Sequence, residues 1–152
     1  INSTHIEATR YLFLRSVRKL TLRFNGILWE GDSNLNKIAT IMKENNISDF
    51  ERVGLYGLTY KENVDDFRES PTLQLLEHQA THLEKPLKTF DPWIKKKITE
   101  NQYLNFEDFI NDVDLVVIMV KHNHILENVD KLKGKIVFDT CNVINLPDCY
   151  KL

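Results

Sequence analysis

The residues best suited to bind a ligand follow a pair of glycines in "GLYGLTYKENVDDFRESP", residues 54–71. Tyr60 and Lys61 come just after a short apolar run, and Arg68 precedes a Ser-Pro pair. An ammonium or guanidinium group binds phosphate oxygens, and a tyrosine ring beside it offers a face on which a base can stack. The pattern predicts a loop that binds an anion. A solvated lysine, and an ion pair of Arg68 with Glu69 or an aspartate, are also compatible with it.

Two other chemistries fit this stretch poorly. Gly54 and Gly57 lack the third glycine of the GxGxxG fingerprint, and the next helix begins only at Ser70, so a dinucleotide pyrophosphate would not meet a helix N-terminus. Close packing of the strand and its turn also explains both glycines. Asp65 and Asp66 are neighbours in a loop, where their carboxylates point apart, and no third oxygen ligand is evident. We therefore predict no metal site.

Strands are expected at intervals from about residue 50 onwards. Short apolar runs predict them, and the run at 114–120 is also rich in β-branched residues. The expected strands are 52–58, 86–92, a short one in "QYLNF" (102–106), 114–120 and 135–140.

Helices are expected between these strands. Ser70 suits an N-cap with Pro71 at the first helical position, which predicts a helix in "SPTLQLLEHQATHL". Asp91 and Pro92 suit the start of a helix in "WIKKKITEN", and Gly134 suits the end of one in "HILENVDKLKG". A further short helix is expected in "NFEDFIND".

This alternation predicts an α/β fold, a Rossmann-like doubly wound parallel sheet of about five strands, preceded by an N-terminal helical segment. Sheets of this kind bind ligands beyond the carboxyl ends of their strands, where the strand order reverses. The loop after the first strand, which carries Tyr60 and Lys61, is therefore the first place to expect a binding site.

We expect residues 1–50 to form a helical segment and residues 51–152 to form the α/β domain. Helical spacing is found in residues 6–24, where basic residues alternate with leucines, as on the solvated side of an amphipathic helix; a phosphate or RNA contact is the alternative. A second helix is expected from Asp32 or Ser33 to about residue 46. The apolar residues expected on one face of it are Ile38, Ile41 and Met42.

The composition limits the classes of protein. With 152 residues, 42% hydrophobic and 28% charged, the sequence suits one domain that buries a core without cross-links. The net charge of −2 gives no reason to expect nucleic acid as a partner, and no apolar run approaches the ~18 residues of a membrane span. Cys141 and Cys149 lack ligand spacing and predict unpaired thiols of a reducing compartment. No secretory pattern follows Ile1, so we expect a processed chain or a piece of a longer one.

The loop sequence resembles a known family. "GLTYKENVDDFRESPTLQLLE" is similar to the segment that opens the C-terminal, UDP-binding domain of the UDP-glucose/GDP-mannose dehydrogenases, with the pattern G-L-[AT]-[FY]-K-x-x-x-x-D-x-R-[DE]-S-P. The matching residues are Gly57, Leu58, Thr59, Tyr60, Lys61, Asp66, Arg68, Glu69, Ser70 and Pro71. "KTFDP", "DLVVIMVKHNHI" and "KGKIVFDTCNVI" resemble later strands of that domain, and the histidine after the fourth strand resembles the UDP-N-acetylmannosamine branch. The resemblance covers about residues 51–145.

The resemblance implies one part of an oxidoreductase. Such enzymes oxidise the 6-hydroxyl of a nucleotide sugar with NAD, which an N-terminal domain holds, and a central helical segment makes the homo-oligomer. Their catalytic cysteine lies in a G-[FY]-G-G-x-C motif that this sequence lacks, so we expect no catalytic residue here. The resemblance implies the UDP-sugar-binding half of a UDP-sugar dehydrogenase, inactive alone and working in the cytoplasm in surface-polysaccharide synthesis. NAD would be bound mainly by the missing domain.

By position in the family pattern, Tyr60 and Lys61 are expected at the uridine nucleotide, and Arg68 at the junction facing the cofactor. Cys141 stands where the family has a basic residue that reaches the nucleotide. Loss of one charge-assisted hydrogen bond costs about 1.5–3 kcal/mol. The alternative is therefore a catalytically inactive remnant that acts as a binding or oligomerisation module. An unrelated flavodoxin-like or receiver-type domain would not need this loop.

Overall fold

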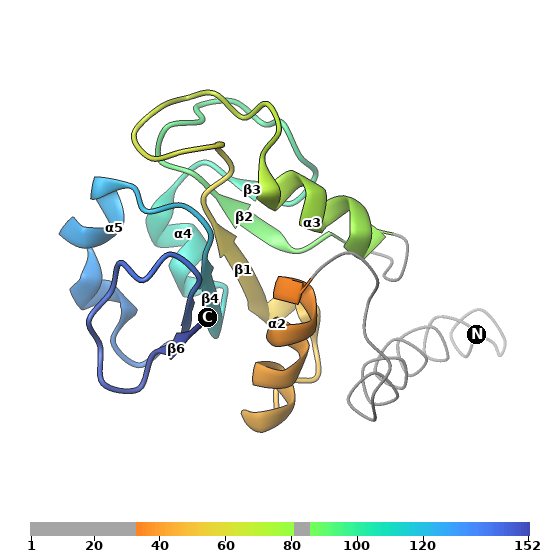
Figure 1. The fold of residues 1–152 in the computed structure, drawn as a ribbon, viewed down its shortest axis with the longest axis vertical. Coiled ribbons are helices and arrows are strands. Elements are labelled where there is room, and N and C mark those ends of the chain that lie inside the picture. Colours follow the sequence, from red (N-terminus) through yellow and green to blue (C-terminus); the bar gives the residue numbers. More distant parts are fainter. Residues whose placement is uncertain (1–32, 81–85) are drawn as a thin grey trace, which may run out of the picture.

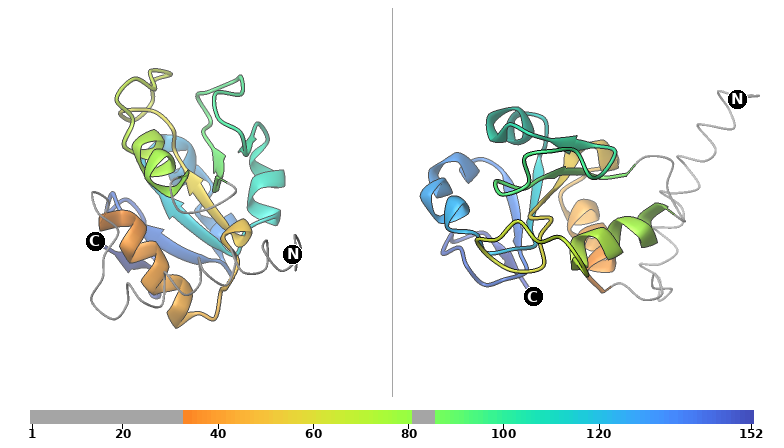
Figure 2. Two further views of the ribbon diagram at one scale, coloured as in Figure 1. Left: turned by 90° about the vertical axis from the view of Figure 1, so that its right-hand side faces the viewer. Right: turned by 90° about the horizontal axis from the view of Figure 1, so that it is seen from above.

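Six parallel strands form one sheet with helices on both faces within residues 33–80 and 86–152, the part of the chain that the computed structural model describes (Figures 1 and 2). The order is β3-β2-β1-β4-β5-β6. The strands are β1 (Val53–Tyr56), β2 (Lys88–Phe90), β3 (Gln102–Tyr103), β4 (Leu115–Ile118), β5 (Ile136–Asp139) and β6 (Tyr150–Lys151). This confirms the predicted doubly wound α/β fold, with one strand more than expected.

Side chains of alternate strand residues enter two separate cores. Leu55 and Val117 pack with α2 (Ser33–Glu44) and α3 (Pro71–Ala80) on one face of the sheet. Val116 and Ile118 pack on the other face with α4 (Phe106–Asn111) and α5 (Asn123–Glu127). The central strands β1 and β4 are buried throughout, as expected of a parallel sheet covered on both sides.

Helix α2 belongs to the first of these cores. It begins at Ser33, as expected, and the predicted face of Ile38, Ile41 and Met42 is buried. This helix therefore shares its core with the sheet although it precedes residue 50. The helix expected in residues 6–24, its basic residues and the end of the helix beyond Ala80 lie outside the described residues.

Local caps explain where two helices begin. Ser70 Oγ accepts a hydrogen bond from the Leu73 N–H at 3.3 Å, and Pro71 opens α3, as the sequence predicts. Asn105 caps α4 by accepting from the Asp108 N–H at 3.1 Å. These caps satisfy backbone donors that have no partner within the helix.

The helix predicted in "WIKKKITEN" is wrong, because residues 92–101 form turns and bends. The buried side chain of Gln102 replaces the helical hydrogen bonds there. Its Oε1 accepts from the N–H groups of Ile98 and Thr99 at 2.6 and 3.3 Å, and its Nε2 donates to the Lys96 carbonyl at 2.9 Å. A side chain that binds three backbone groups stabilises this irregular loop without a helix.

Two further elements differ from the prediction. "HILENVDKLKG" divides into α5 and a 3₁₀ turn, η2 (Val129–Leu132), where Asn128 Nδ2 donates to the His124 carbonyl at 2.7 Å. The sixth strand, β6, pairs with β5 over two residues and has no apolar run that could predict it.

No helix among the described residues is long and apolar enough to cross a bilayer.

A methyl group added at Gly54 and one added at Gly134 would be unfavourable for different reasons. A Cβ on Gly54, in β1, would lie 2.6 Å from ring atoms of Phe109, whereas one on Gly134 would meet nothing within 4 Å but would sit at a φ of +82°. We expect Gly54→Ala to lower the free energy of unfolding by about 1–3 kcal/mol through overpacking. Gly134→Ala should cost about 1–2 kcal/mol through backbone strain.

Urea unfolding of both variants checks this prediction. The additional substitution Phe109→Leu should relieve part of the cost of Gly54→Ala and none of the cost of Gly134→Ala. Equal recovery in the two backgrounds would contradict the steric explanation for Gly54.

Candidate functional site

The strand order reverses between β1 and β4. The chain leaves β1 toward β2 on one side, whereas it leaves β4 toward β5 on the other. The carboxyl ends of these strands face the same edge of the sheet, so the loops that follow them meet there. Ligands of doubly wound sheets bind at this position. The loop after β1, which the sequence singled out, therefore lies at the reversal point.

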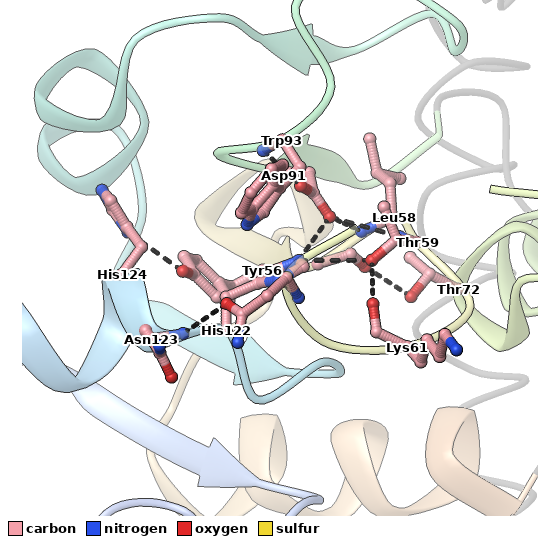
Figure 3. A network of polar contacts seen from close by, with 12 residues as sticks. Tyr56, Leu58, Thr59, Lys61, Thr72, Asp91, Trp93, His122, Asn123 and His124 are labelled. Atoms are coloured by element: carbon pink, nitrogen blue, oxygen red, sulfur yellow. Dashed lines mark hydrogen bonds and ion pairs between the residues drawn. The ribbon is translucent and has the colours of Figure 1, made fainter. Parts of the chain in front are cut away.

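A buried carboxylate joins the loops after β1 and β2. Asp91 Oδ2 accepts from the N–H groups of Leu58 and Thr59 at 2.6 and 3.2 Å, and its Oδ1 accepts from the Trp93 N–H at 2.7 Å (Figure 3). The Asp91 side chain is completely buried. A carboxylate withdrawn from water requires such donors, so these bonds fix the path of the chain just before Tyr60.

The loop after β4 adds a buried histidine to the same group. His122 Nε2 lies 2.9 Å from Asp91 Oδ2, and its Nδ1 accepts from the Asn63 N–H at 2.9 Å (Figure 3 shows the ring between the loops). Both His122 and Asp91 are completely buried. The histidine thus connects the chain on both sides of the predicted binding residues.

Two threonines hold the inside of the loop. Thr59 Oγ1 donates to the Lys61 carbonyl at 2.8 Å, and Thr72 Oγ1, in the first turn of α3, donates to the Gly57 carbonyl at 2.6 Å. Gly57 has a φ of +105°, and an added Cβ would lie 2.7 Å from Val120 Cβ. Only glycine combines this backbone angle with this close approach to the loop after β4.

Tyr60 and Lys61 project from this fixed backbone. Tyr60 is 59% exposed, Lys61 is exposed as well, and the Tyr60 N–H donates to the Asp66 carbonyl at 2.9 Å. No ion pair engages the Lys61 ammonium among the described residues. A loop held by several hydrogen bonds therefore presents an aromatic ring and a cation to the outside, and ligand binding by these two residues stays a prediction.

Arg68 is held by a carboxylate instead of projecting freely. Its Nη2 lies 2.7 Å from Asp66 Oδ2 and its Nε donates to Oδ1 at 3.0 Å, while the Arg68 side chain stays 85% exposed. This decides between the two ion pairs that the sequence left open, since the partner is Asp66 and not Glu69. The hydrogen bonds from Arg68 lower the pKa of Asp66 to about 2.

Cys141 lies in the loop after β5, close to the carboxyl end of β4. Its Sγ is 3.8 Å from the Ile118 carbonyl oxygen and 3.6 Å from Thr140 Oγ1, at the ends of β4 and β5. Burial raises the pKa of this thiol, and Lys121 opposes the rise. Nucleophilic cysteines need the thiolate, so this environment is unsuited to that role. The sequence analysis missed Lys121 as a second cation near this position.

A second buried carboxylate organises the loop that follows β5. Asp139 accepts from the N–H groups of Cys141, Val143 and Ile144 at 3.0, 2.7 and 2.7 Å. Lys151 Nζ, from β6, donates to Asp139 Oδ2 at 2.7 Å and also to the Ile144 carbonyl. Burial raises the pKa of Asp139, but these donors outweigh it and leave the pKa below its usual value.

A hollow of about 360 Å³ opens beside the loop after β1. Phe67 and Trp93 line it together with Lys95 and Lys96. Tyr60 and Lys61 do not line it, so the residues predicted to bind the ligand lie on an open edge and not inside this hollow. The described residues contain no group of three or more His, Cys, Asp or Glu side chains that could hold a metal ion.

The sequence analysis missed Asp91, His122 and Asn63 as members of the site. The sequence pattern predicts Asp91 as the start of a helix, and it singles out a histidine after the fourth strand only through the family resemblance. The positions of Asp91 and His122 in the sequence are a signal that could have identified these two residues. Asp91 follows β2 directly and His122 follows β4 closely, and these two strands flank β1.

A family model matches most of the described chain. Residues 54–146 match the UDP-binding domain model of the UDP-glucose/GDP-mannose dehydrogenase family. The chain belongs to this family. The match starts in β1 and ends in the loop after β5, so it contains the loops that surround Asp91 and His122.

Relatives in the family include sugar-nucleotide dehydrogenases. The chain is 33% identical over 143 residues to a UDP-N-acetyl-D-mannosamine dehydrogenase of Methanococcus vannielii, covering 88% of this chain and 31% of the relative. It is 28% identical over 92 residues to an NDP-N-acetyl-D-galactosaminuronic acid dehydrogenase of Ralstonia nicotianae, covering 58% and 22%. The chain thus spans about a third or less of the length of these curated relatives.

Solved structures agree with the fold. The UDP-D-ManNAc dehydrogenase of Pyrococcus horikoshii superposes with a TM-score of 0.57 at 23% identity, over 80% of this chain and 34% of that one. The UDP-N-acetyl-mannosamine dehydrogenase of Staphylococcus aureus superposes with a TM-score of 0.52 at 25% identity, over 78% and 31%. The family domain therefore has the same doubly wound arrangement.

The pairing of Arg68 with Asp66 predicts an acid titration. A carboxyl whose pKa is lowered in the folded chain stabilises it above the unfolded pKa near 3.8, and this contribution is lost as the pH falls through about 2. We expect the Asp66 carboxyl ¹³C resonance to titrate with a midpoint at about 2. In Arg68→Gln the midpoint should rise toward 3.8.

Asp114 serves as the internal control for this titration. Its pKa is lowered by Arg52, whose Nη2 lies 2.9 Å from Asp114 Oδ1 at the opposite edge of the sheet. Arg68→Gln should leave the Asp114 midpoint unchanged. An Asp66 midpoint that does not move in this variant would show that Arg68 is not its partner in solution.

Proposed function

We propose that this chain is the UDP-sugar-binding, C-terminal portion of an NAD-dependent nucleotide-sugar 6-dehydrogenase, and that UDP-N-acetylmannosamine is its sugar nucleotide. The loop after β1 supports this most strongly, because bonds from Asp91, His122 and Thr72 hold its backbone while Tyr60 and Lys61 stay exposed. Preorganised donors lose little entropy when a ligand binds. Similarity to UDP-N-acetyl-D-mannosamine dehydrogenases supports the choice of sugar.

Each exposed residue has a distinct task in this proposal. The Lys61 ammonium binds the diphosphate of UDP as a point charge, and the Tyr60 ring stacks against the uracil base. Lys121, near Cys141, supplies a second cation at the same edge. The ligand is held through its nucleotide, and the reacting sugar carbon points away from this chain.

NAD does not fit the described residues alone. The segment between β1 and α3 lacks a GxGxxG turn, and α3 begins at Pro71, well after the strand ends. We propose that another domain of the same enzyme holds NAD and supplies the hydride chemistry. Arg68 then lies at the junction with that domain and faces the cofactor side, and its pairing with Asp66 fixes its direction.

The open edge around Lys61 agrees with a two-part site. Tyr60 and Lys61 are exposed, so a bound nucleotide would stay in contact with water on one side. A partner domain that closes over this edge would exclude that water and strengthen the charge interactions. We propose cytoplasmic synthesis of a surface polysaccharide as the setting and a homo-oligomer built through the helical segment before residue 50.

Cys141 favours a second candidate, a remnant that binds or oligomerises without catalysis. A half-buried thiol whose pKa is raised by burial stands where the family pattern has a cation, and Lys151 is engaged by the Asp139 carboxylate. A site with less positive charge binds a diphosphate more weakly. The two candidates therefore differ in the affinity of the chain for UDP.

Lys61→Ala tests the binding loop. We expect it to weaken UDP binding by about 10- to 100-fold, because a hydrogen bond to a charged group is worth about 1.5–3 kcal/mol. Thermal shift with UDP, UDP-N-acetylmannosamine, UDP-glucose, GDP-mannose and NAD measures it, since a ligand that binds only the folded chain raises stability by RT ln(1 + [L]/Kd).

Lys133→Ala is the matched control, because Lys133 is exposed and precedes β5 at the opposite edge of the sheet. Its affinity for UDP should equal that of the unsubstituted chain, and NAD should produce no shift in any variant. Equal affinities of the Lys61 and Lys133 variants would refute the assignment of Lys61.

Cys141→Arg distinguishes a weakened site from a lost one. If position 141 faces the nucleotide, an arginine there should increase the affinity for UDP roughly tenfold by adding a charge-assisted hydrogen bond. Cys141→Ser removes the thiol without adding charge and should leave the affinity unchanged. Isothermal calorimetry of both variants measures this, and a folded arginine variant with unchanged affinity would argue against a nucleotide contact at position 141.

A further inference from the structure

The His122 ring touches three loops but no solvent. It follows β4, contacts Asp91 after β2 through Nε2, and contacts Asn63 in the loop after β1 through Nδ1. Its side chain is completely buried, so His122 does not reach a ligand bound at the open edge. Any effect that it has on binding must therefore pass through the loops that it joins.

The contacts fix the position of the ring proton. The Asn63 N–H can only donate, so His122 Nδ1 accepts with its lone pair and carries no hydrogen. The proton therefore resides on Nε2, which faces Asp91 Oδ2 at 2.9 Å and Thr59 Oγ1 at 3.3 Å. The Thr59 hydroxyl donates to the Lys61 carbonyl, so its oxygen is free to accept from Nε2. One neutral tautomer satisfies every contact.

The bonds of the ring lie on both sides of the exposed pair. Thr59 precedes Tyr60 and Lys61, and Asn63 follows them. Asn63 has a φ of 59°, a left-handed conformation that asparagine tolerates better than most residues. Its Oδ1 accepts from the Asn123 N–H at 3.0 Å, so the loop after β4 holds Asn63 by its side chain as well.

We propose that His122 is a positioning residue that sets the loop carrying Tyr60 and Lys61, acting through its unprotonated Nδ1. Asp91 holds the ring from the β2 side, and the ring in turn holds the Asn63 N–H. This inference rests on the proposed function for its consequence in UDP binding. The tautomer and the loop contact themselves do not depend on it.

Two variants, each of which mimics one ring nitrogen of His122, distinguish the role of Nδ1 from that of Nε2. In His122→Asn the side-chain oxygen can occupy the place of Nδ1 and accept from Asn63, but it loses the contact with Asp91. In His122→Gln the side-chain amide can reach Asp91 in place of Nε2, but it leaves Asn63 without an acceptor. His122→Ala removes both contacts and serves as the reference for complete loss.

The first readout needs no ligand. In ¹⁵N spectra of the full chain, His122 should show a deprotonated Nδ1 and a protonated Nε2. Amide exchange at Asn63 should be roughly tenfold or more faster in His122→Gln, as expected when a protecting bond is lost, and close to that of the unsubstituted chain in His122→Asn. A protonated Nδ1, or equal exchange in both variants, would overturn the proposal.

The second readout is the affinity for UDP by calorimetry. His122→Gln should weaken binding roughly tenfold, and His122→Asn should restore most of that loss. His78→Gln, in the last turn of α3, is the control for the substitution itself and should bind as the unsubstituted chain does. Equal losses in the Gln and Asn variants would reduce His122 to a core residue and overturn the proposal.

The two readouts separate this inference from the proposed function. If the unsubstituted chain does not bind UDP, the proposed function fails, while Asn63 exchange and the ring tautomer still decide whether His122 positions the loop. If UDP binds but the Asn63 amide exchanges at the same rate in His122→Gln and His122→Asn, the positioning role fails and the proposed function stands.

Discussion

A carboxylate buried after β2 needs hydrogen-bond donors, and the loops at the carboxyl edge of the sheet supply them. Asp91 receives the N–H groups of Leu58, Thr59 and Trp93 together with the His122 ring. An ionised carboxylate without such donors would be strongly unfavourable in the interior. The backbone that supplies two of these donors, Leu58 and Thr59, leads directly into Tyr60 and Lys61, so the stability of this edge and the positions of the two exposed side chains depend on one group.

A second buried aspartate at the carboxyl edge of the sheet binds backbone N–H groups in the same way. Asp139 at the end of β5 collects three backbone N–H groups from the following loop, with Lys151 as a counter-ion. Asp91 directly follows β2 and Asp139 ends β5, the two strands on either side of the β1–β4 pair, and each carboxylate binds backbone N–H groups of nearby loops. Apolar packing on both faces of the sheet holds the strands that carry them. The strands and their buried carboxylates thus fix the backbone of this edge, whereas Tyr60 and Lys61 stay exposed.

The alternating apolar runs were enough to predict the layered α/β fold, because buried parallel strands and amphipathic helices have distinct periods. They also predicted that the loop with Tyr60 and Lys61 follows the first strand, at the carboxyl ends of the strands, where the structure has it. The non-helical path of residues 92–101 was beyond such reasoning, since it depends on one side chain, Gln102, bonding to three backbone groups. The pairing of Asp91 with His122 joins residues 31 positions apart, and no local pattern encodes such a contact. Hydrogen bonds between residues distant in sequence therefore determine these loop conformations, and sequence periodicity does not predict such bonds.

Strand β6 links a charge to the loop that follows β5. The Lys151 ammonium is the counter-ion of Asp139, and the Asp139 carboxylate binds the backbone N–H groups of Cys141 and Ile144. A change of charge at Lys151 would therefore alter the loop that contains Cys141, although β6 itself pairs with β5 over only two residues.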